Sequence, residues 1–256
     1  MGKLVFFDID GTLFDHEKRV PHSAKQAIID LQNRGIEVAI ATGRPPVMFK
    51  DVMNELGITT FVSCNGSYVV HRGEEVYTNM LQHEALQALE TLAQDKGHPM
   101  LHSYHDLLWV NRENHPFVIR ALNELRVRMP AFQPRLSRTQ EVYYSGLYCE
   151  ETEEAYVHEF PQFRIIRWHT QAIDILPAGG SKAQGIQKLL DLTGIKQEDT
   201  FAFGDGINDV EMLEFVGTGI AMGNACSEAK AAADLITRHV SDDGIRHGLE
   251  MVGLLK

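Results

Sequence analysis

Three apolar segments of this 256-residue chain each end in a short polar motif, and this repeated pattern constrains the fold more than any other feature. Aliphatic and aromatic residues dominate the segments, which is typical of buried strands. The segments and their motifs are Leu4–Phe7 with Asp8-Ile9-Asp10-Gly11-Thr12, residues 36–41 with Thr42-Gly43-Arg44, and residues 200–203 with Gly204-Asp205-Gly206-Ile207-Asn208-Asp209. Helical patterns separate them, so we predict an α/β fold with a parallel sheet. Because parallel strands end at one edge, where ligands bind, we expect the motifs to form one site.

Asp8 and Asp10 are the most informative pair in these motifs. On an extended chain, side chains two residues apart lie on the same face, so we expect the two carboxylates to converge. Two adjacent carboxylates repel each other, and a bound cation is the commonest relief. An Asp-x-Asp-Gly motif alone is more often a simple turn. The other motifs of the chain favour a cation site instead.

In these motifs the chain resembles the haloacid dehalogenase (HAD) superfamily of phosphotransferases. The four sequence elements of that superfamily occur in order: Asp8 with Asp10, then Thr42, then Lys182, and then the acidic motif at residues 204–209. Further motifs resemble the Cof-type subfamily, and these are Asn65-Gly66, Asp174-Ile175-Leu176-Pro177 leading into Ser181-Lys182, and Ala221-Met222-Gly223-Asn224-Ala225. The resemblance covers nearly the whole chain. It implies a Rossmann-like (HAD-like) parallel-sheet core with an inserted α+β cap domain, and phosphatase activity.

The resemblance also implies catalytic roles. Asp8 would be the nucleophile that forms an aspartyl-phosphate, and Asp10 the general acid and base. Mg²⁺ would be held by the carboxylates of Asp8 and Asp205 and by the backbone carbonyl of Asp10. Asp209 would be a further ligand or a residue that orients one. Lys182 would offset the charge of the nucleophile and the phosphoryl group.

The remaining candidates would contact the phosphate or the leaving group. Thr42 and Asn208 are expected to donate hydrogen bonds to phosphate oxygens. Thr12 would brace the loop beside the phosphate. Gly43, Arg44 and Asn65 complete the predicted substrate-binding set.

The rhythm of the sequence predicts two domains. Strand and helix alternate over residues 1–80 and 179–256, so we expect these ranges to form one discontinuous catalytic core. Residues 81–178 contain successive strands and are expected to form an α+β cap that selects the substrate. The helices expected within the cap lie near residues 84–94, 116–128 and 151–158.

Two expected core helices have recognisable start and stop signals. Ser23 is expected to cap the first, whose apolar face contains Ala24, Ala27, Ile28 and Leu31. Pro45-Pro46 is expected to open the second, which would stop at Gly57.

Composition excludes several classes of partner. A net charge of −11, from 24 Lys and Arg against 35 Asp and Glu, disfavours a nucleic-acid surface. Three widely separated cysteines fit free thiols in a reducing cytoplasm better than a disulfide scaffold. The short apolar run after Lys3 fits neither a signal peptide nor a membrane span. We therefore expect a soluble cytoplasmic protein, as a monomer or weak homodimer.

The predicted activity is Mg²⁺-dependent hydrolysis of small phosphorylated metabolites. The resemblance implies sugar phosphates first, with nucleotides, flavin mononucleotide and pyridoxal phosphate as other candidates. A phosphosugar mutase is an alternative, because it would need a basic cap to hold a second phosphate, and the cap contains Arg112, Arg120, Arg126, Arg128, Arg135 and Arg138. A non-catalytic ligand-binding or regulatory protein is the other alternative, which the intact set of catalytic positions disfavours.

Overall fold

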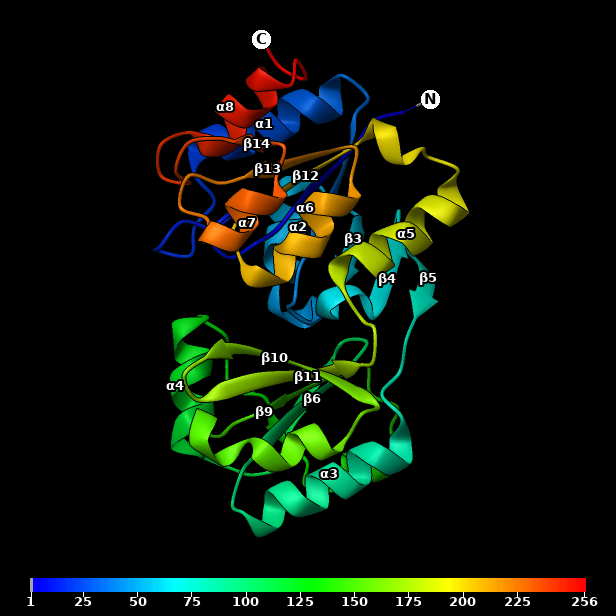
Figure 1. Cartoon of the computed structure of the whole chain (residues 1–256), viewed down its shortest axis with the longest axis vertical. Coiled ribbons are helices and arrows are strands. Elements are labelled where there is room, and N and C mark those ends of the chain that lie inside the picture. Colours follow the sequence, from blue (N-terminus) through cyan, green and yellow to red (C-terminus); the bar gives the residue numbers. More distant parts are fainter. Residues whose placement is uncertain (1) are drawn as a thin grey trace. The chain divides into compact units, whose positions relative to one another are not determined.

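The computed structural model describes residues 2–256 and divides into two compact units (Figure 1). The first unit contains the chain up to Arg44, together with Lys50–Tyr77 and Ser181–Lys256. The second contains Pro45–Phe49 and Thr78–Gly180. The first unit is therefore assembled from segments that are far apart in the sequence. The assignment of catalysis to one unit and substrate selection to the other stays a prediction.

The first unit is built on an eight-stranded sheet. Its strands, in spatial order, are β14 (Leu235–Ile236), β13 (Thr218–Ala221), β12 (Thr200–Gly204), β1 (Leu4–Phe7), β2 (Glu37–Ala41), β3 (Thr60–Ser63), β4 (Tyr68–His71) and β5 (Glu74–Thr78). The strands from β14 to β3 are parallel, and β4 turns back antiparallel to β3. The three strands that precede the polar motifs lie next to one another in the sheet, in the spatial order β12, β1, β2. Their carboxyl ends consequently lie side by side.

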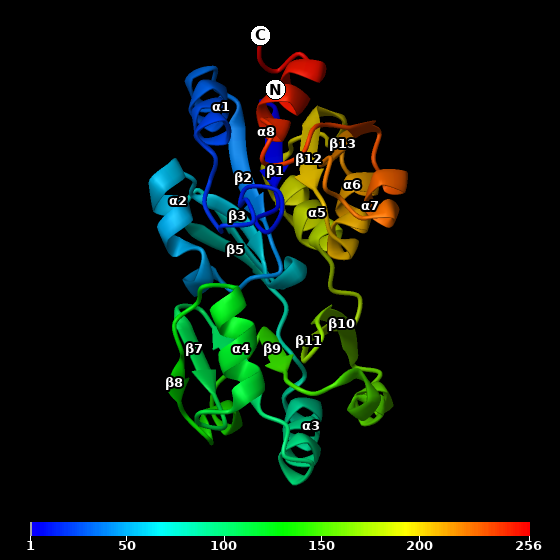
Figure 2. The ribbon, with the colours of Figure 1, turned by 90° about the vertical axis from the view of Figure 1, so that its left-hand side faces the viewer.

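Helices cover both faces of this sheet. They are α1 (His22–Asn33), α2 (Lys50–Leu56), α5 (Lys182–Thr193), α6 (Val210–Phe215), α7 (Ser227–Ala232) and α8 (Gly244–Met251). Figure 2 shows α1 and α2 on one side of the sheet and α5, α6 and α7 on the other. Because both faces are covered, the central strand β1 is apolar throughout, and all four of its residues have no exposed surface. Within residues 2–256, no helix is long and apolar enough to cross a membrane.

Close packing joins the central strands to the helices. The rings of Phe7 and Phe203, on adjacent strands β1 and β12, stack with their centroids 5.0 Å apart. Helix α8 approaches Phe203 through Gly248, where a Cβ atom would lie only 2.5 Å from the ring. This packing holds the end of β1 in place.

The predicted signals for two core helices were partly wrong. The apolar face of α1 is buried as expected, but the helix begins at His22 with Pro21 at the N-cap and no side-chain cap from Ser23. The rigid φ of proline sets the entry of the chain without a capping hydroxyl. The helix expected after Pro45 is interrupted, because Phe49 leaves the helical region at φ −133° between a 3₁₀ turn at Pro46–Met48 and α2.

The second unit contains a six-stranded sheet flanked by helices α3 (His83–Asp95) and α4 (Pro116–Glu124). Its strands, in spatial order, are β10 (Phe163–His169), β11 (Ala172–Pro177), β9 (Tyr144–Leu147), β6 (Met100–Tyr104), β7 (Leu107–Val110) and β8 (Ala131–Phe132). Neighbours are antiparallel except for β7 and β8, which run parallel. The apolar face of α3 packs on the sheet through Leu86 and Leu89, which contribute to one core with Trp109 and Ile173.

The sequence predicted more α-helical residues in this unit than the structure contains. Helix α4 stops at Glu124, four residues before the predicted end, and Arg126 has a positive φ of 54° that no continuing α-helix could accommodate. The helix predicted over residues 151–158 is two 3₁₀ segments, Glu151–Glu153 and Ala155–Glu159. So short a segment needs a buried face to stay α-helical, and only Tyr156 and Val157 are buried here.

A buried polar network ties α3 to the sheet of the second unit. Glu90 accepts hydrogen bonds from Ser137 at 2.5 Å and Asn111 at 2.8 Å, and its Oε1 lies 3.4 Å from His102 Nε2. His102 in turn lies 2.7 Å from the Ser145 hydroxyl. Burial acts to raise the pKa of Glu90, but the interactions with His102 and the other donors outweigh it and lower the pKa to about 2. Glu90 is therefore held as a carboxylate in the folded unit.

Candidate active site

The chain turns sharply after β1, and this turn exposes the first motif to the other strand ends. The amide of Asp8 continues the pairing of β1 by donating to Phe203 at 3.0 Å. Gly11 then has a φ of +85°, which favours glycine. A Cβ atom at this position would lie 2.2 Å from Oδ2 of Asp205. Glycine is therefore needed here both for the turn and for the close approach of the third motif.

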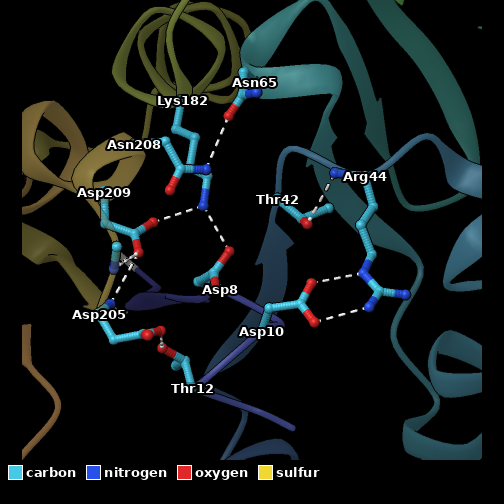
Figure 3. A network of polar contacts seen from close by, with 11 residues as sticks. Asp8, Asp10, Thr12, Thr42, Arg44, Asn65, Lys182, Asp205, Asn208 and Asp209 are labelled. Atoms are coloured by element: carbon cyan, nitrogen blue, oxygen red, sulfur yellow. Dashed lines mark hydrogen bonds and ion pairs between the residues drawn. The ribbon is translucent and has the colours of Figure 1, made fainter. Parts of the chain in front are cut away.

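Lys182 links the first and third motifs through a buried ion pair with two carboxylates. Its Nζ atom donates to Oδ1 of Asp8 and to Oδ1 of Asp209, both at 2.6 Å (Figure 3). The lysine is 1% exposed and starts α5, where the hydroxyl of Ser181 accepts from the amide of Gln184 as an N-cap. Burial opposes the charge of Lys182, but the carboxylates of Asp209 and Asp8 outweigh it and raise its pKa. The residue that sequence composition would place at the surface is a buried cation.

Three carboxylates gather beside this lysine. Oxygens of Asp8, Asp205 and Asp209 lie within 4.8 Å of one another. Burial is the main reason that the pKa of Asp8 lies well above its usual value, and it also raises the pKa of Asp205 to about 6. The mutual repulsion of the carboxylates adds to both shifts, since Asp209 contributes to each. Buried carboxyls with raised pKa values gain stability from a bound cation, and oxygen donors suit Mg²⁺.

The three carboxylates are not equally available to a metal. Asp209 uses Oδ1 for Lys182 and Oδ2 for the amides of Asp205 and Gly206, at 2.9 and 2.8 Å. Within residues 2–256, the carboxylate of Asp205 accepts one hydrogen bond, from the Thr12 hydroxyl at 2.7 Å. This arrangement fits a ligand role for Asp8 and Asp205 and an orienting role for Asp209.

The carboxylate of Asp10 is not part of the cluster formed by Asp8, Asp205 and Asp209, although its charge adds to the raised pKa of Asp8 and of Asp205. This carboxylate instead pairs with Arg44, which donates from Nε to Oδ2 at 2.6 Å and from Nη2 to Oδ1 at 2.8 Å. Lys18 also donates to Oδ1 at 2.6 Å. Strand β1 ends at Phe7, so the two-residue alternation of an extended chain does not continue through the turn. The carboxylate of Asp10 is therefore held by two cationic side chains.

Two cations determine the charge of Asp10. Burial acts to raise its pKa, but the hydrogen bonds and charges of Arg44 and Lys18 outweigh burial and lower the pKa to about 2. Arg44 is itself 6% exposed and lies over the ring of Phe14, 5.6 Å from its centroid. Asp10 is consequently an ionised, firmly held carboxylate in the substrate-free protein.

The second motif and Asn65 form the other side of the site. The Thr42 hydroxyl accepts from the amide of Arg44 at 3.1 Å, so its own proton is available to a ligand. Asn208 donates from Nδ2 to Oδ1 of Asn65 at 3.1 Å (Figure 3). A Cβ atom on Gly43 would lie 3.0 Å from Nδ2 of Asn65. These contacts place Thr42, Gly43, Asn65 and Asn208 next to one another.

The backbone at Cys64 and Asn65 is strained, as is common at functional sites. Cys64 and Asn65 have consecutive positive φ values of 51° and 48°. Residues other than glycine keep a left-handed backbone conformation only where their surroundings enforce it. Here the amide of Asn65 donates to the carbonyl of Thr42 at 3.1 Å, which ties the strained turn to the second motif.

The sequence analysis missed two residues of the site. Lys18 contacts Asp10, and nothing in its polar sequence context distinguishes it from a surface lysine. Asn224 donates to the carbonyl of Gly11 at 2.7 Å and accepts from the amide of Val240 at 2.9 Å. It belongs to the motif at residues 221–225 that resembles Cof-type proteins, in which the sequence alone indicates no contact for this asparagine. Asn224 braces the first motif from the side of β13.

Comparison with known proteins agrees with this site. The family model described as haloacid dehalogenase-like hydrolase matches residues 5–249. YkrA of Bacillus subtilis (strain 168), a protein named as a phosphatase, is 41% identical over 100% of this chain and 99% of its own. The pyridoxal phosphate phosphatase YbhA of Escherichia coli (strain K12) is 27% identical, over 95% of this chain and 96% of its own.

A solved structure has the same fold over the same length. The HAD subclass IIB sugar phosphatase BT4131 superposes with a TM-score of 0.89 and 31% identity, covering 99% of this chain and 100% of that one. The family match spans both the carboxylate cluster and the buried lysine. This chain belongs to the haloacid dehalogenase-like hydrolase family and is a phosphatase of that family.

Proposed function

We propose that this phosphatase hydrolyses small phosphorylated metabolites through an aspartyl-phosphate on Asp8, with Mg²⁺ as cofactor. The buried pair of Asp8 with Lys182, 2.6 Å apart, is the observation that carries the proposal. Lys182 contacts only Oδ1 of Asp8, and within residues 2–256 Oδ2 accepts no hydrogen bond. A carboxylate held by one oxygen and open at the other is suited to attack on phosphorus.

In the first step, an oxygen of Asp8 bonds to phosphorus as the bond to the leaving oxygen breaks. Asp10 gives a proton to that leaving oxygen. Lys182 offsets the negative charge that builds up on the phosphoryl oxygens. The substrate itself favours the acid form of Asp10, because a nearby phosphate dianion raises the pKa of a carboxyl group.

In the second step, water attacks the phosphorus of the aspartyl-phosphate, and the bond to Asp8 breaks. Asp10 accepts the proton of that water, which returns it to the acid form. Inorganic phosphate leaves and Asp8 is restored as a carboxylate. Replacing Asp10 with asparagine is expected to slow turnover by about 10²–10⁴-fold, the usual contribution of acid–base catalysis.

The residues present fit Mg²⁺. Asp8 and Asp205 would hold it through carboxylate oxygens, and Asp10 through its backbone carbonyl, while Asp209 keeps Lys182 and the 205–206 backbone in place. Bound Mg²⁺ supplies positive charge that offsets the repulsion between the carboxylate nucleophile and the phosphate.

The other side of the site would bind the phosphate. Thr42 can donate its hydroxyl proton, and the side-chain amides of Asn65 and Asn208 hydrogen-bond to each other. Polar groups fixed before the substrate arrives stabilise developing charge without reorganising. Gly43 permits this arrangement, because its missing Cβ leaves room for Asn65.

We further propose sugar phosphates as the first substrates to test, with the second unit selecting the leaving group. The sugar phosphatase BT4131 and the pyridoxal phosphate phosphatase YbhA support a small phosphorylated substrate. Exchanging residues 81–178 for those of a relative should transfer substrate preference. Preference that stayed with the core would contradict this role for the second unit.

We also propose a cytoplasmic location, with the protein as a monomer or weak homodimer. Within residues 2–256, none of the three cysteines forms a disulfide, and Cys64 and Cys149 are buried. Buried cysteines outside disulfides fit a reducing compartment. Size-exclusion chromatography with light scattering would measure the oligomeric state.

The direct experiment measures phosphate release from a panel of phosphorylated metabolites, with Mg²⁺ or with EDTA. We expect metal-dependent release by the wild type and none by Asp8→Asn. Asp51→Asn, which changes an exposed aspartate of α2, is the matched control and should retain full activity. Activity of Asp8→Asn near that of the wild type would contradict the aspartyl-phosphate mechanism.

A further inference from the structure

We infer that Lys18 is a positioning residue, which directs proton exchange by Asp10 to one carboxylate oxygen, Oδ2. The inference rests on the proposed function, in which Asp10 is the general acid and base. Lys18 does not enter the phosphatase chemistry described above.

The two carboxylate oxygens of Asp10 accept different numbers of hydrogen bonds. Oδ1 accepts two, from Lys18 Nζ at 2.6 Å and Arg44 Nη2 at 2.8 Å. Oδ2 accepts one, from Arg44 Nε at 2.6 Å. No other donor to Asp10 occurs in the part of the chain that the structure describes. A carboxylate offers about two acceptor positions on each oxygen, so Oδ1 is filled and Oδ2 keeps one position open.

Lys18 makes the two oxygens different. With Arg44 alone, each oxygen of Asp10 would accept one hydrogen bond, and a proton could move through either. The second bond to Oδ1 removes that choice. Proton transfer needs a donor and an acceptor within about 2.6–3.2 Å of each other in a suitable orientation, so restricting it to one oxygen fixes where the leaving oxygen and the attacking water must lie.

A short loop that is closed on itself holds Lys18 in place. The amide of Asp15 donates to the carbonyl of Arg19, and the amide of Lys18 donates to the carbonyl of Asp15, both at 3.0 Å. The side chain of Asp15 accepts from the amides of Glu17 and Arg19, at 2.8 and 3.0 Å. Lys18 itself has a positive φ of 56°, a conformation that a lysine keeps only where its surroundings enforce it.

The contact also differs from an ordinary surface ion pair. The side chain of Lys18 is 24% exposed and joins a carboxylate that already has a bidentate partner in Arg44. Lys25 and Glu55 form an ordinary surface ion pair. Their side chains are 39% and 48% exposed, and Lys25 Nζ lies 3.0 Å from Oε1 of Glu55. Lys25 therefore provides a matched control on the same unit.

The test compares two leaving groups. An alkyl phosphate releases an alkoxide, which needs a proton from Asp10, whereas p-nitrophenyl phosphate releases a stabilised phenolate that needs little help. The value of kcat/KM reports the step that expels the leaving group. A residue that positions the general acid should therefore matter for the first substrate and much less for the second. A purely structural residue would affect both equally.

We would measure kcat and KM for p-nitrophenyl phosphate and for the best alkyl substrate among glucose 6-phosphate, ribose 5-phosphate and glycerol 3-phosphate. For Lys18→Met we expect kcat/KM of the alkyl substrate to fall about 10–100-fold, below the full contribution of an acid–base group. The value for p-nitrophenyl phosphate should change less than about threefold, and this retained activity shows that the variant is folded. Lys18→Arg should recover most of the loss, and Lys25→Met should change neither substrate.

Equal losses for both substrates, or no loss for either, would overturn the assignment of Lys18 while leaving the proposed function intact. A loss that Lys18→Arg does not reduce would also overturn it, because arginine can supply the hydrogen bond to Oδ1 that is the property at issue. Wild-type protein that releases no phosphate from any of these substrates would overturn the proposed function, and the role of Lys18 with it.

Discussion

The hydroxyl of Thr12 donates a 2.7 Å hydrogen bond to Oδ1 of Asp205, and the two residues are 193 positions apart in the sequence. This bond joins the motif after β1 to the motif after β12. Thr12 has no exposed surface, so the contact is protected from competition by water. It orients one of the carboxylates that we propose as a Mg²⁺ ligand.

Thr12→Val is therefore expected to weaken Mg²⁺ binding by about 10–100-fold, the usual effect of removing a group that orients a metal ligand. Valine has nearly the shape of threonine but cannot donate the hydrogen bond. Isothermal titration calorimetry with Mg²⁺ would measure the change directly, without an activity assay. Thr12→Ser keeps the hydroxyl and should bind Mg²⁺ almost as the wild type does. Equal affinities of the valine and serine variants would contradict the orienting role.

Lys182→Met is expected to lower the free energy of unfolding by about 3–5 kcal/mol at neutral pH, because it leaves two buried carboxylates without their cation. The partners affected are Asp8 and Asp209, both at 2.6 Å. Urea denaturation followed by circular dichroism would measure the loss. Lys188→Met, on the exposed side of the same helix, should lose no more than about 1 kcal/mol, the contribution of its cation–π contact with Tyr77, whose ring centroid lies 5.7 Å away. Similar losses in the two variants would show that the buried pair is not the cause.

Gly11→Ala is expected to abolish phosphatase activity and to destabilise the first unit. The added Cβ would lie 2.2 Å from Asp205, at a backbone φ of +85°. Gly73→Ala is a matched control, because Gly73 has a φ of +86° with nothing within 4 Å of the added Cβ. Both variants should lose about 1–2 kcal/mol of stability from the left-handed backbone. Only Gly11→Ala should also lose kcat/KM, and a comparable loss in Gly73→Ala would contradict this reading.

The stability of the second unit should fall as the pH drops from about 4.5 to about 2. The pKa of Glu90 is lowered from 4.5 to about 2 in the folded protein, so its carboxylate stabilises the fold above the unfolded pKa. Protonation removes this contribution as the pH falls through that interval. The shift corresponds to at most about 3 kcal/mol.

Tryptophan fluorescence can follow this transition selectively, because the only two tryptophans of the sequence, Trp109 and Trp168, lie in the second unit. Urea unfolding at a series of pH values would give the stability of that unit in the wild type and in Glu90→Gln. The variant, which cannot ionise at this position, should show a smaller dependence on pH between about 4.5 and 2. An unchanged dependence would mean that Glu90 does not control it.

Much of the first unit was predictable because its signals are local. The residues of β1 and the buried face of α1 are apolar at the spacing of a strand and a helix, and both elements form where that spacing indicated. The predictions that were wrong concern marginal segments. The helix expected at residues 151–158 has too few buried residues to be α-helical, and the proline entry of α1 made a Ser23 cap unnecessary.

The amino-acid sequence by itself determined the α/β class, the order of the polar motifs and the types of side chain at the strand ends. Only the tertiary structure decided how those side chains pair: that Lys182 is buried between Asp8 and Asp209, and that Asp10 turns to Arg44 and Lys18. Periodicity along a chain reports which residues are buried, because burial follows from hydrophobicity and spacing. The choice of partner for a charged group depends on backbone turns and on residues that lie between 8 and 174 positions away in these pairs, and such contacts leave no pattern in the local sequence.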